Sequence, residues 1–197
     1  AIEFAYQGPL LKLNNGNTNF AITGDVFFNI IRKDSKIEKG ECYQNYTLYD
    51  GEQIDIISTK KTVYGYLSVS GGFDIPQVWG SYSVNTKAEV GPNNGKKFNV
   101  NDKILIKEKV LKDIKFKKID YEPNLDNIVR VIKGTNFDYF SSKAQGIFLN
   151  EMYSVSRLVG RMGMRLDGPS LENINKALAE YSRVIKNNCF FLYIYIF

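Results

Sequence analysis

The chain has 197 residues, of which 44% are hydrophobic and 24% are charged, as in one large globular domain or two small ones. Its 26 basic and 21 acidic residues give a net charge of +5, which is mildly basic and not the charge of a polycation. No histidine is present in this chain. Its residues therefore exclude Ser-His-Asp and Cys-His catalysis and histidine-ligated zinc, and leave proton transfer to Asp, Glu, Lys or Tyr.

Short β-prone runs dominate the N-terminal part of the chain. Residues 3–6 and 10–13 flank Gly8-Pro9 and predict a hairpin, and Asn15-Gly16 is typical of a second tight hairpin turn. Turn residues recur about every eight to twelve positions, which favours a barrel or a sandwich over a parallel α/β sheet. Further strands are predicted at residues 20–23, 26–32, 43–48, 53–58 and 63–70.

The middle of the chain is richer in turn residues and lysines. Residues 85–102 include Gly91-Pro92 and are predicted to form a surface loop. Residues 103–118 alternate lysines with apolar side chains, so we interpret them as strands with a solvated lysine face. They lack the arginines interleaved with aromatic residues that base recognition prefers, and no nucleic-acid partner is expected. Strands are predicted at residues 104–107, 114–119 and 127–132.

Two helices complete the predicted secondary structure. Ser141 or Ser142 can cap a helix at residues 143–150, in which Ile147 and Phe148 face inward. Ser170 can cap a longer helix at 171–186, whose apolar stripe predicts a core or interface face. A break at Glu122-Pro123 sets the predicted domains: a first β-barrel subdomain at 1–122, part of a second β subdomain at 123–170, and an atypical helix with an apolar tail at 171–197.

Neither end of the chain predicts insertion into a membrane. Residues 1–3 lack the charged and apolar regions of a signal peptide, and the apolar tail at 189–197 is far shorter than the roughly 20 residues of a transmembrane helix. Cys42 and Cys189 stand apart without a CxxC spacing, which is typical of reduced, packed thiols. We therefore expect a cytoplasmic protein without a membrane partner.

A glycine-dense turn follows the strand predicted at residues 63–70. Gly71-Gly72 requires the backbone freedom of glycine, and successive N–H groups in such a turn can form an anion-binding concavity. Asp74 could accept a proton or hold Mg²⁺ through water, and Ser81 could donate a hydrogen bond. The alternative is structural: a Gly-Gly bend in which Asp74 caps its own backbone, with Ser81 as an ordinary surface serine.

A second turn brings two arginines close together in the sequence. Arg161 and Arg165 lie on either side of Gly163 and could present guanidinium groups to a carboxylate or a phosphate of a small-molecule substrate. The alternative is a tight β-turn with exposed arginines. The motifs GxxxxGKS and GxGxxG are absent, no metal site is predicted, and the catalytic residues remain unknown. We expect the turn at Gly71-Gly72 and the turn around Gly163 to close over one negatively charged ligand.

Several segments occur in an order that one protein family shares. They are Ile22-Thr23-Gly24, the run 66–76, Val78-Trp79-Gly80-Ser81-Tyr82-Ser83, the runs 130–134 and 138–140, and the runs 153–156 and 161–169. Together they resemble the family of 5-oxoprolinase C subunits, also described as biotin-dependent carboxyltransferase or allophanate hydrolase subunit 2 proteins and including the KipA type. The likeness covers roughly residues 1–175, and relative to that family the chain is expected to be truncated at both ends.

The resemblance implies a mainly β fold of cyclophilin-like β-barrel subdomains, with a few short helices and a C-terminal helix. It implies a hydrolase component, inactive alone, that opens 5-oxo-L-proline to L-glutamate with ATP and Mg in a complex with the A and B subunits of 5-oxoprolinase as partners. Two alternatives are implied as well. One is a carboxyltransferase half-domain of a urea carboxylase-like enzyme with biotin, and the other is a regulatory protein that binds a kinase inhibitor. Tyr82 stands where the family has an arginine, so one candidate anion ligand is missing there.

Overall fold

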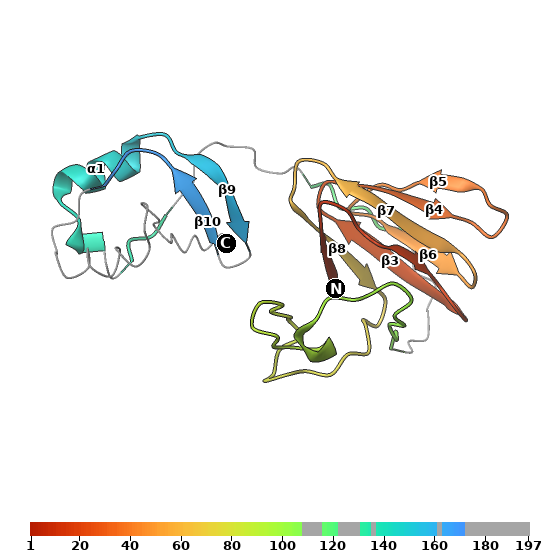
Figure 1. Ribbon diagram of the computed structural model, residues 1–197. Helices are drawn as coiled ribbons and strands as arrows, with labels where there is room; N and C mark the ends of the chain where they lie inside the picture. The colour runs from red at the N-terminus through yellow and green to blue at the C-terminus, as the bar shows by residue number, and fades with distance from the viewer. Residues whose placement is uncertain (108–115, 122–130, 135–136, 161–162, 172–197) are drawn as a thin grey trace. The chain divides into compact units, whose positions relative to one another are not determined.

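The computed structural model of the protein describes residues 1–107, 116–121, 131–134, 137–160 and 163–171 (Figure 1). The chain divides into two compact units, Ala1–Pro123 and Asn124–Phe197. The sequence-based domains at 1–122, 123–170 and 171–197 stay a prediction, because residues 172–197 lie outside the described part of the chain.

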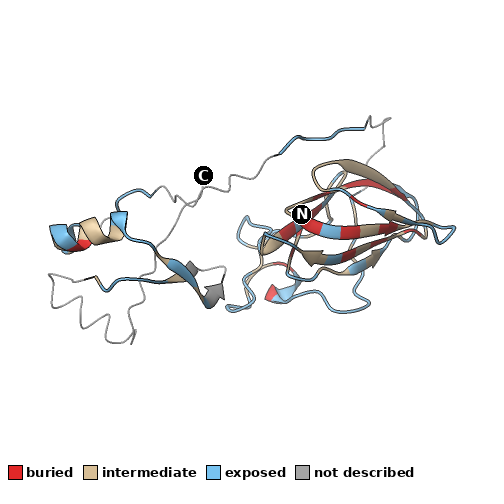
Figure 2. Cartoon of the chain, turned by 90° about the horizontal axis from the view of Figure 1, so that it is seen from above, coloured by how far each residue is buried: buried red, intermediate tan, exposed pale blue. Residues whose placement is uncertain are grey.

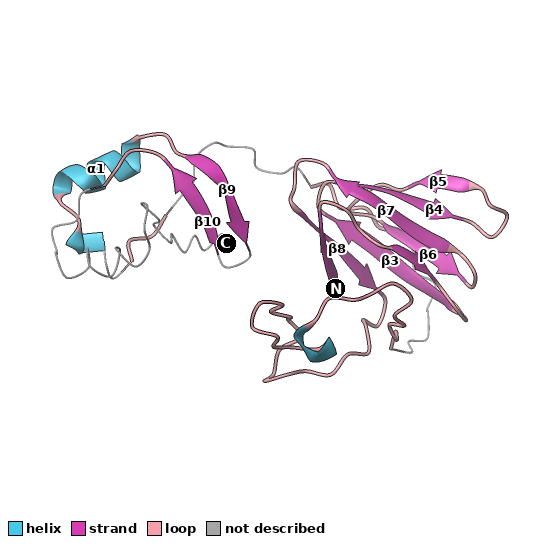
Figure 3. Ribbon diagram, viewed as in Figure 1, coloured by secondary structure: helices cyan, strands magenta, loops and turns pink. Residues whose placement is uncertain are grey.

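The first unit consists of two four-stranded antiparallel sheets (Figure 3). The first sheet has the order β1 (Ile2–Ala5), β8 (Tyr64–Val69), β3 (Asn17–Thr23) and β6 (Asn45–Tyr49). The second has the order β2 (Leu10–Lys12), β7 (Gln53–Thr59), β4 (Val26–Ile31) and β5 (Ile37–Lys39). The mainly β fold predicted from the sequence is therefore confirmed.

The two sheets bury a single hydrophobic core between them. Alternate residues of β4 are buried, as period-2 patterning requires of a strand with one face on a core. Figure 2 colours the buried residues red along the strands of the first unit. The largest fully buried side chains are Phe20, Ile22 and Leu67 from the first sheet and Phe28, Ile30 and Ile56 from the second. Burial of each contributes about 1.5–3 kcal/mol, so this cluster is the main source of the unit's stability.

Both predicted hairpins in the N-terminal part are wrong. β1 pairs with β8 and β2 pairs with β7, so Gly8-Pro9 carries the chain from one sheet to the other. Asn15 and Gly16 do adopt left-handed φ angles of 72° and 74°, as a tight turn requires, but they join β2 to β3 in different sheets. Turn chemistry predicted the local reversal of the chain. The pairing partner of each strand depends instead on which face it buries in the core that the two sheets share.

Residues 70–107, which follow β8, form a long irregular segment that contains the short 3₁₀ helix η1 (Asn93–Gly95). The strand predicted at 104–107 is wrong, because only an isolated bridge, Phe73 to Ile106, forms there. Residues 116–119 likewise make one bridge, Gln44 to Lys118, at the free edge of β6, and residues 114–115 lie outside the described part. Of the strand predicted at 127–132, residues 131–132 are irregular and the others are not described.

The second unit contains η2 (Phe137–Tyr139), α1 (Ser142–Asn150), β9 (Ser154–Gly160) and β10 (Gly163–Asp167). The predicted helix at 143–150 is confirmed, and its N-cap is Ser141, whose hydroxyl accepts a hydrogen bond from the N–H of Ala144 at 3.1 Å. The helix predicted at 171–186 lies outside the described residues. Within the described part, no helix is long and apolar enough to cross a membrane.

Candidate functional site

The Gly71-Gly72 turn ends β8, and both glycines have left-handed φ angles of 81° and 85°. The N–H of Gly72 donates to the carbonyl of Val69 at 3.1 Å, which closes the turn. A Cβ at Gly72 would meet no atom within 4 Å. The φ angle, and not lack of space, therefore accounts for glycine at this position.

Residues 105–107 hold the turn from the other side. The N–H of Asp74 donates to the Leu105 carbonyl at 2.8 Å, and the N–H of Lys107 donates to the Gly72 carbonyl at 3.0 Å. The N–H groups of Gly72 and Asp74 thus already bond to backbone carbonyls, so an anion at this turn would have to use other donors. The Asp74 side chain is exposed and makes no hydrogen bond within the described residues.

Ser81 belongs to a tight hairpin just beyond that turn. Val78 and Ser81 exchange backbone hydrogen bonds of 2.9 and 3.0 Å around Trp79-Gly80. The hydroxyl oxygen of Ser81 accepts a hydrogen bond from the N–H of Ser83 at 3.1 Å. Among the described residues its proton has no acceptor, so the hydrogen-bond donor role of Ser81 stays a prediction.

Arg165 lies on β10, where the ladder with β9 shifts register between Met164 and Leu166. Its side chain is 24% exposed, and its Nε lies 3.8 Å from Oδ1 of Asp167. Arg161 lies outside the described residues. The Gly71-Gly72 turn, Asp74 and Ser81 belong to the first unit and Arg165 to the second. A site that all of them share therefore stays a prediction.

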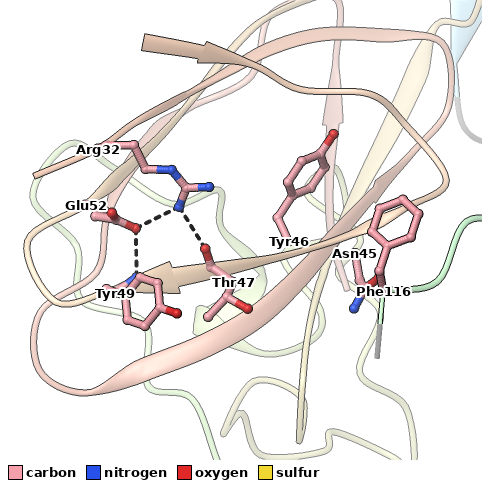
Figure 4. A pocket seen from close by; sticks show the side chains of 7 residues that line it. All are labelled: Arg32, Asn45, Tyr46, Thr47, Tyr49, Glu52 and Phe116. Carbon is pink, nitrogen blue, oxygen red and sulfur yellow. Dashed lines mark hydrogen bonds and ion pairs between the residues drawn. The ribbon is translucent and has the colours of Figure 1, made fainter. Parts of the chain in front are cut away.

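Sequence reasoning missed a cavity of about 380 Å³ beside β6. Figure 4 shows the side chains that line it: Arg32, Asn45, Tyr46, Thr47, Tyr49, Glu52 and Phe116. The charged side chains of this cavity already form hydrogen bonds and ion pairs with one another and with neighbouring groups. The Arg32 guanidinium donates to Glu52 Oε2 at 3.0 Å and to the Thr47 carbonyl at 2.9 Å, and its other nitrogens donate to Glu38 Oε2 at 2.7 and 2.9 Å.

These contacts make the cavity wall an ion-pair cluster that links the edges of the two sheets. Arg32 follows β4 in the second sheet, whereas Thr47 lies on β6, an edge strand of the first. Burial alone would lower the pKa of Arg32, but the hydrogen bonds that its guanidinium donates to the Glu38 and Glu52 carboxylates, with the attraction of their charges, outweigh it and raise that pKa. With its charges satisfied, the cluster is suited to closing the seam between the sheets. Among the described residues, no group of three acidic or thiol side chains could hold a metal ion.

Comparison with known proteins identifies the family. The family described as carboxyltransferase domain, subdomain A and B, matches residues 1–188, and the chain belongs to it. A 5-oxoprolinase C subunit from Haemophilus influenzae is 26% identical over 174 residues, 87% of this chain and 53% of its own length. The protein of the same name from Escherichia coli is 25% identical over 170 residues, 84% of this chain and 54% of its own length.

The fold of the chain is also similar to that of solved structures. The crystal structure of the K. lactis urea amidolyase matches with a TM-score of 0.70 at 21% identity, over 88% of this chain and 11% of that one. At this identity the likeness shows the fold alone. The chain spans about half the length of the two curated relatives.

Proposed function

We propose that the chain acts as one component of an ATP-dependent 5-oxoprolinase, which opens 5-oxo-L-proline to L-glutamate together with partner A and B subunits. The observation that carries this proposal is the likeness, over most of the chain, to two proteins named as the C subunit of 5-oxoprolinase. A protein that is named as one subunit acts within a complex of several subunits. The chain is therefore expected to be inactive alone.

The substrate chemistry fits the residues that the sequence singled out. 5-Oxoproline carries one carboxylate and a cyclic amide, so its recognition requires a cationic group and neutral donors. In this proposal Arg165, with Arg161, binds the carboxylate or a phosphate through the guanidinium fork. Ser81 offers its hydroxyl proton, and the exposed Asp74 carboxylate is available to accept a proton.

ATP and its Mg²⁺ belong to the assembled complex in this proposal. The chain carries neither GxxxxGKS nor GxGxxG, and two N–H groups at the Gly71-Gly72 turn are used by carbonyls. Bound ATP would supply the driving force for ring opening. The contribution of this chain would be to orient the anionic end of the substrate.

A carboxyltransferase half-domain that uses biotin is the second candidate. The description of the matching family favours it, because that family is named for carboxyl transfer. In that case the same arginines would bind the carboxylate of carboxybiotin or of the acceptor. The two candidates differ in the product that can be measured.

The test is reconstitution with the A and B subunits encoded in the same genome. ADP release that depends on 5-oxoproline, with equal formation of glutamate, supports the oxoprolinase. Carboxylation of urea with a biotin carboxylase, without 5-oxoproline turnover, supports the second candidate instead. A complex that assembles but gives no ADP with 5-oxoproline rules out the first.

Variants test the anion site within a working complex. Arg165→Ala and Arg161→Ala should each raise the KM for 5-oxoproline about 10- to 100-fold, because a charge-assisted hydrogen bond is lost. Arg157→Ala is the matched control, because Arg157 is an exposed arginine of the same β9–β10 hairpin. Full activity of Arg165→Ala would refute the proposed role of Arg165.

A further inference from the structure

Trp79 is the single tryptophan of the chain, and it is 87% exposed at the tip of the Val78–Ser81 hairpin. Its φ angle is 52° and that of Gly80 is 74°, the left-handed pair that a two-residue type I′ turn requires. Asparagine and aspartate suit the first of these positions, whereas a bulky side chain is strained there. The residue at the tip is thus a poor choice for the turn itself.

Tyr43 shows how this fold compensates for similar strain elsewhere. Its φ angle is 62°, but its hydroxyl accepts a hydrogen bond from the N–H of Gly24 at 3.1 Å. Its ring also stacks on Tyr121 with 4.6 Å between centroids. Trp79 has no such contact, since within the described residues its indole makes no hydrogen bond, ring contact or cation contact. Among the described residues of the first unit, no side-chain contact offsets the strain at Trp79.

From this contrast we infer that the Trp79 hairpin is a docking element that inserts its indole into a partner protein of the proposed complex. The inference rests on the proposed function, since it takes the chain to be one component among several. Tryptophan is the residue most enriched among side chains that dominate binding energy, and it acts when buried in a partner pocket. Residues that are strained in the free protein are also concentrated at such functional positions.

The hairpin also indicates the chemistry of the partner's surface. An indole needs an apolar pocket, and its N–H needs an acceptor once it is buried. Beside the tip, Tyr82 is 56% exposed, and the Lys107 ammonium lies 6.0 Å from the centre of its ring. A matching partner therefore presents an apolar pocket with one carbonyl or carboxylate acceptor inside it and a negative charge at the rim facing Lys107.

The single tryptophan makes the inference directly measurable. The full chain labelled with 5-fluorotryptophan gives one ¹⁹F resonance, which should shift and broaden when the unlabelled A and B subunits are added. Trp79→Asn should fold, because asparagine fits the turn, and should weaken the affinity for the partner at least 10-fold. Ile37→Thr is the control, because Ile37 is an exposed apolar residue (64%) of the first unit that has no positive φ angle. Its affinity should stay within about twofold of the parent.

The outcomes separate this inference from the proposed function. If the parent chain binds the A and B subunits, but its ¹⁹F signal does not move and Trp79→Asn binds equally well, the docking role is wrong and the proposed function stands. If the parent chain neither binds them nor supports ADP release with 5-oxoproline, the proposed function fails and this partner assignment fails with it. A moving signal with weakened binding of Trp79→Asn alone supports the inference.

Discussion

Arg32 donates a hydrogen bond to the Glu52 carboxylate at 3.0 Å, and only 7% of the Glu52 side chain is exposed. The same carboxylate oxygen accepts the N–H of Tyr49 at 2.9 Å. One buried anion thus ties the turn after β6 to the end of β4. Because β6 and β4 belong to different sheets, the contact holds the two sheets together beside the edge strand β6.

Glu52→Gln should lower the free energy of unfolding by about 1.5–3 kcal/mol, the range for a buried hydrogen bond to a charged group. The amide keeps the shape of the side chain but removes the charge that pairs with Arg32. Urea unfolding followed by circular dichroism measures the change. The control is Glu41→Gln, whose carboxylate is 63% exposed in its pair with Lys118 and which should leave the midpoint unchanged. Unaltered stability of Glu52→Gln would contradict the role of the cluster.

Gly40→Ala should destabilise the first unit, because a Cβ at this position would overlap the ring of Phe28. Gly40 cannot move away easily, since its N–H donates to the Phe28 carbonyl at 3.0 Å. Overpacking of this kind costs about 1–3 kcal/mol. The double variant Gly40→Ala, Phe28→Leu should recover part of the loss, so the two effects should not add. Strict additivity of the two substitutions would show that the clash is absent.

Ser141→Ala should weaken α1 by about 1 kcal/mol, because it removes the hydroxyl that accepts the Ala144 N–H. Hydrogen exchange of the α1 amides reports the loss as faster exchange in the first turn. Ser142→Ala is the control, since Ser142 is the first residue inside the helix and not its cap. Equal effects of the two substitutions would mean that the cap contributes nothing.

Burial raises the pKa of the Cys42 thiol, whose Sγ lies 3.5 Å from the Val26 carbonyl. A raised folded-state pKa adds stability below the unfolded thiol pKa of about 8.5, and this contribution is lost as pH rises through the folded pKa. In a Cys189→Ser background, stability should therefore fall above pH about 8.5, and iodoacetamide should modify the folded thiol more slowly than the urea-unfolded one. Cys42→Ser should abolish that slope. Equal alkylation rates in the two states would refute the shift.

The sequence predicted local structure better than it predicted which strands pair. The helix at 143–150 was predictable because a capping serine and a helical apolar pattern are both local signals, and the left-handed Asn15-Gly16 turn was predictable for the same reason. Which strands pair was not predictable, since the pairing of β1 with β8 joins residues about sixty positions apart around a common core.

The candidate site shows the same division. The Gly71-Gly72 turn was expected from its glycines. The hydrogen bonds from Asp74 to Leu105 and from Lys107 to Gly72 were not, because they join segments about thirty residues apart in the chain. Arg32 gave no signal beyond an ordinary arginine after a strand. Its role comes from Glu52 and Thr47, which reach it only when the two sheets meet.

Among the eight strands that the structure describes in the first unit, β4 and β5 are the only neighbours in the chain that lie in the same sheet. Every other step along the chain changes sheet, so each sheet gains its strands alternately with the other. Neither layer can assemble ahead of its counterpart, and we expect folding to be all-or-none and slow, as for other topologies dominated by distant pairings. A nick in any one connection would therefore loosen both layers together.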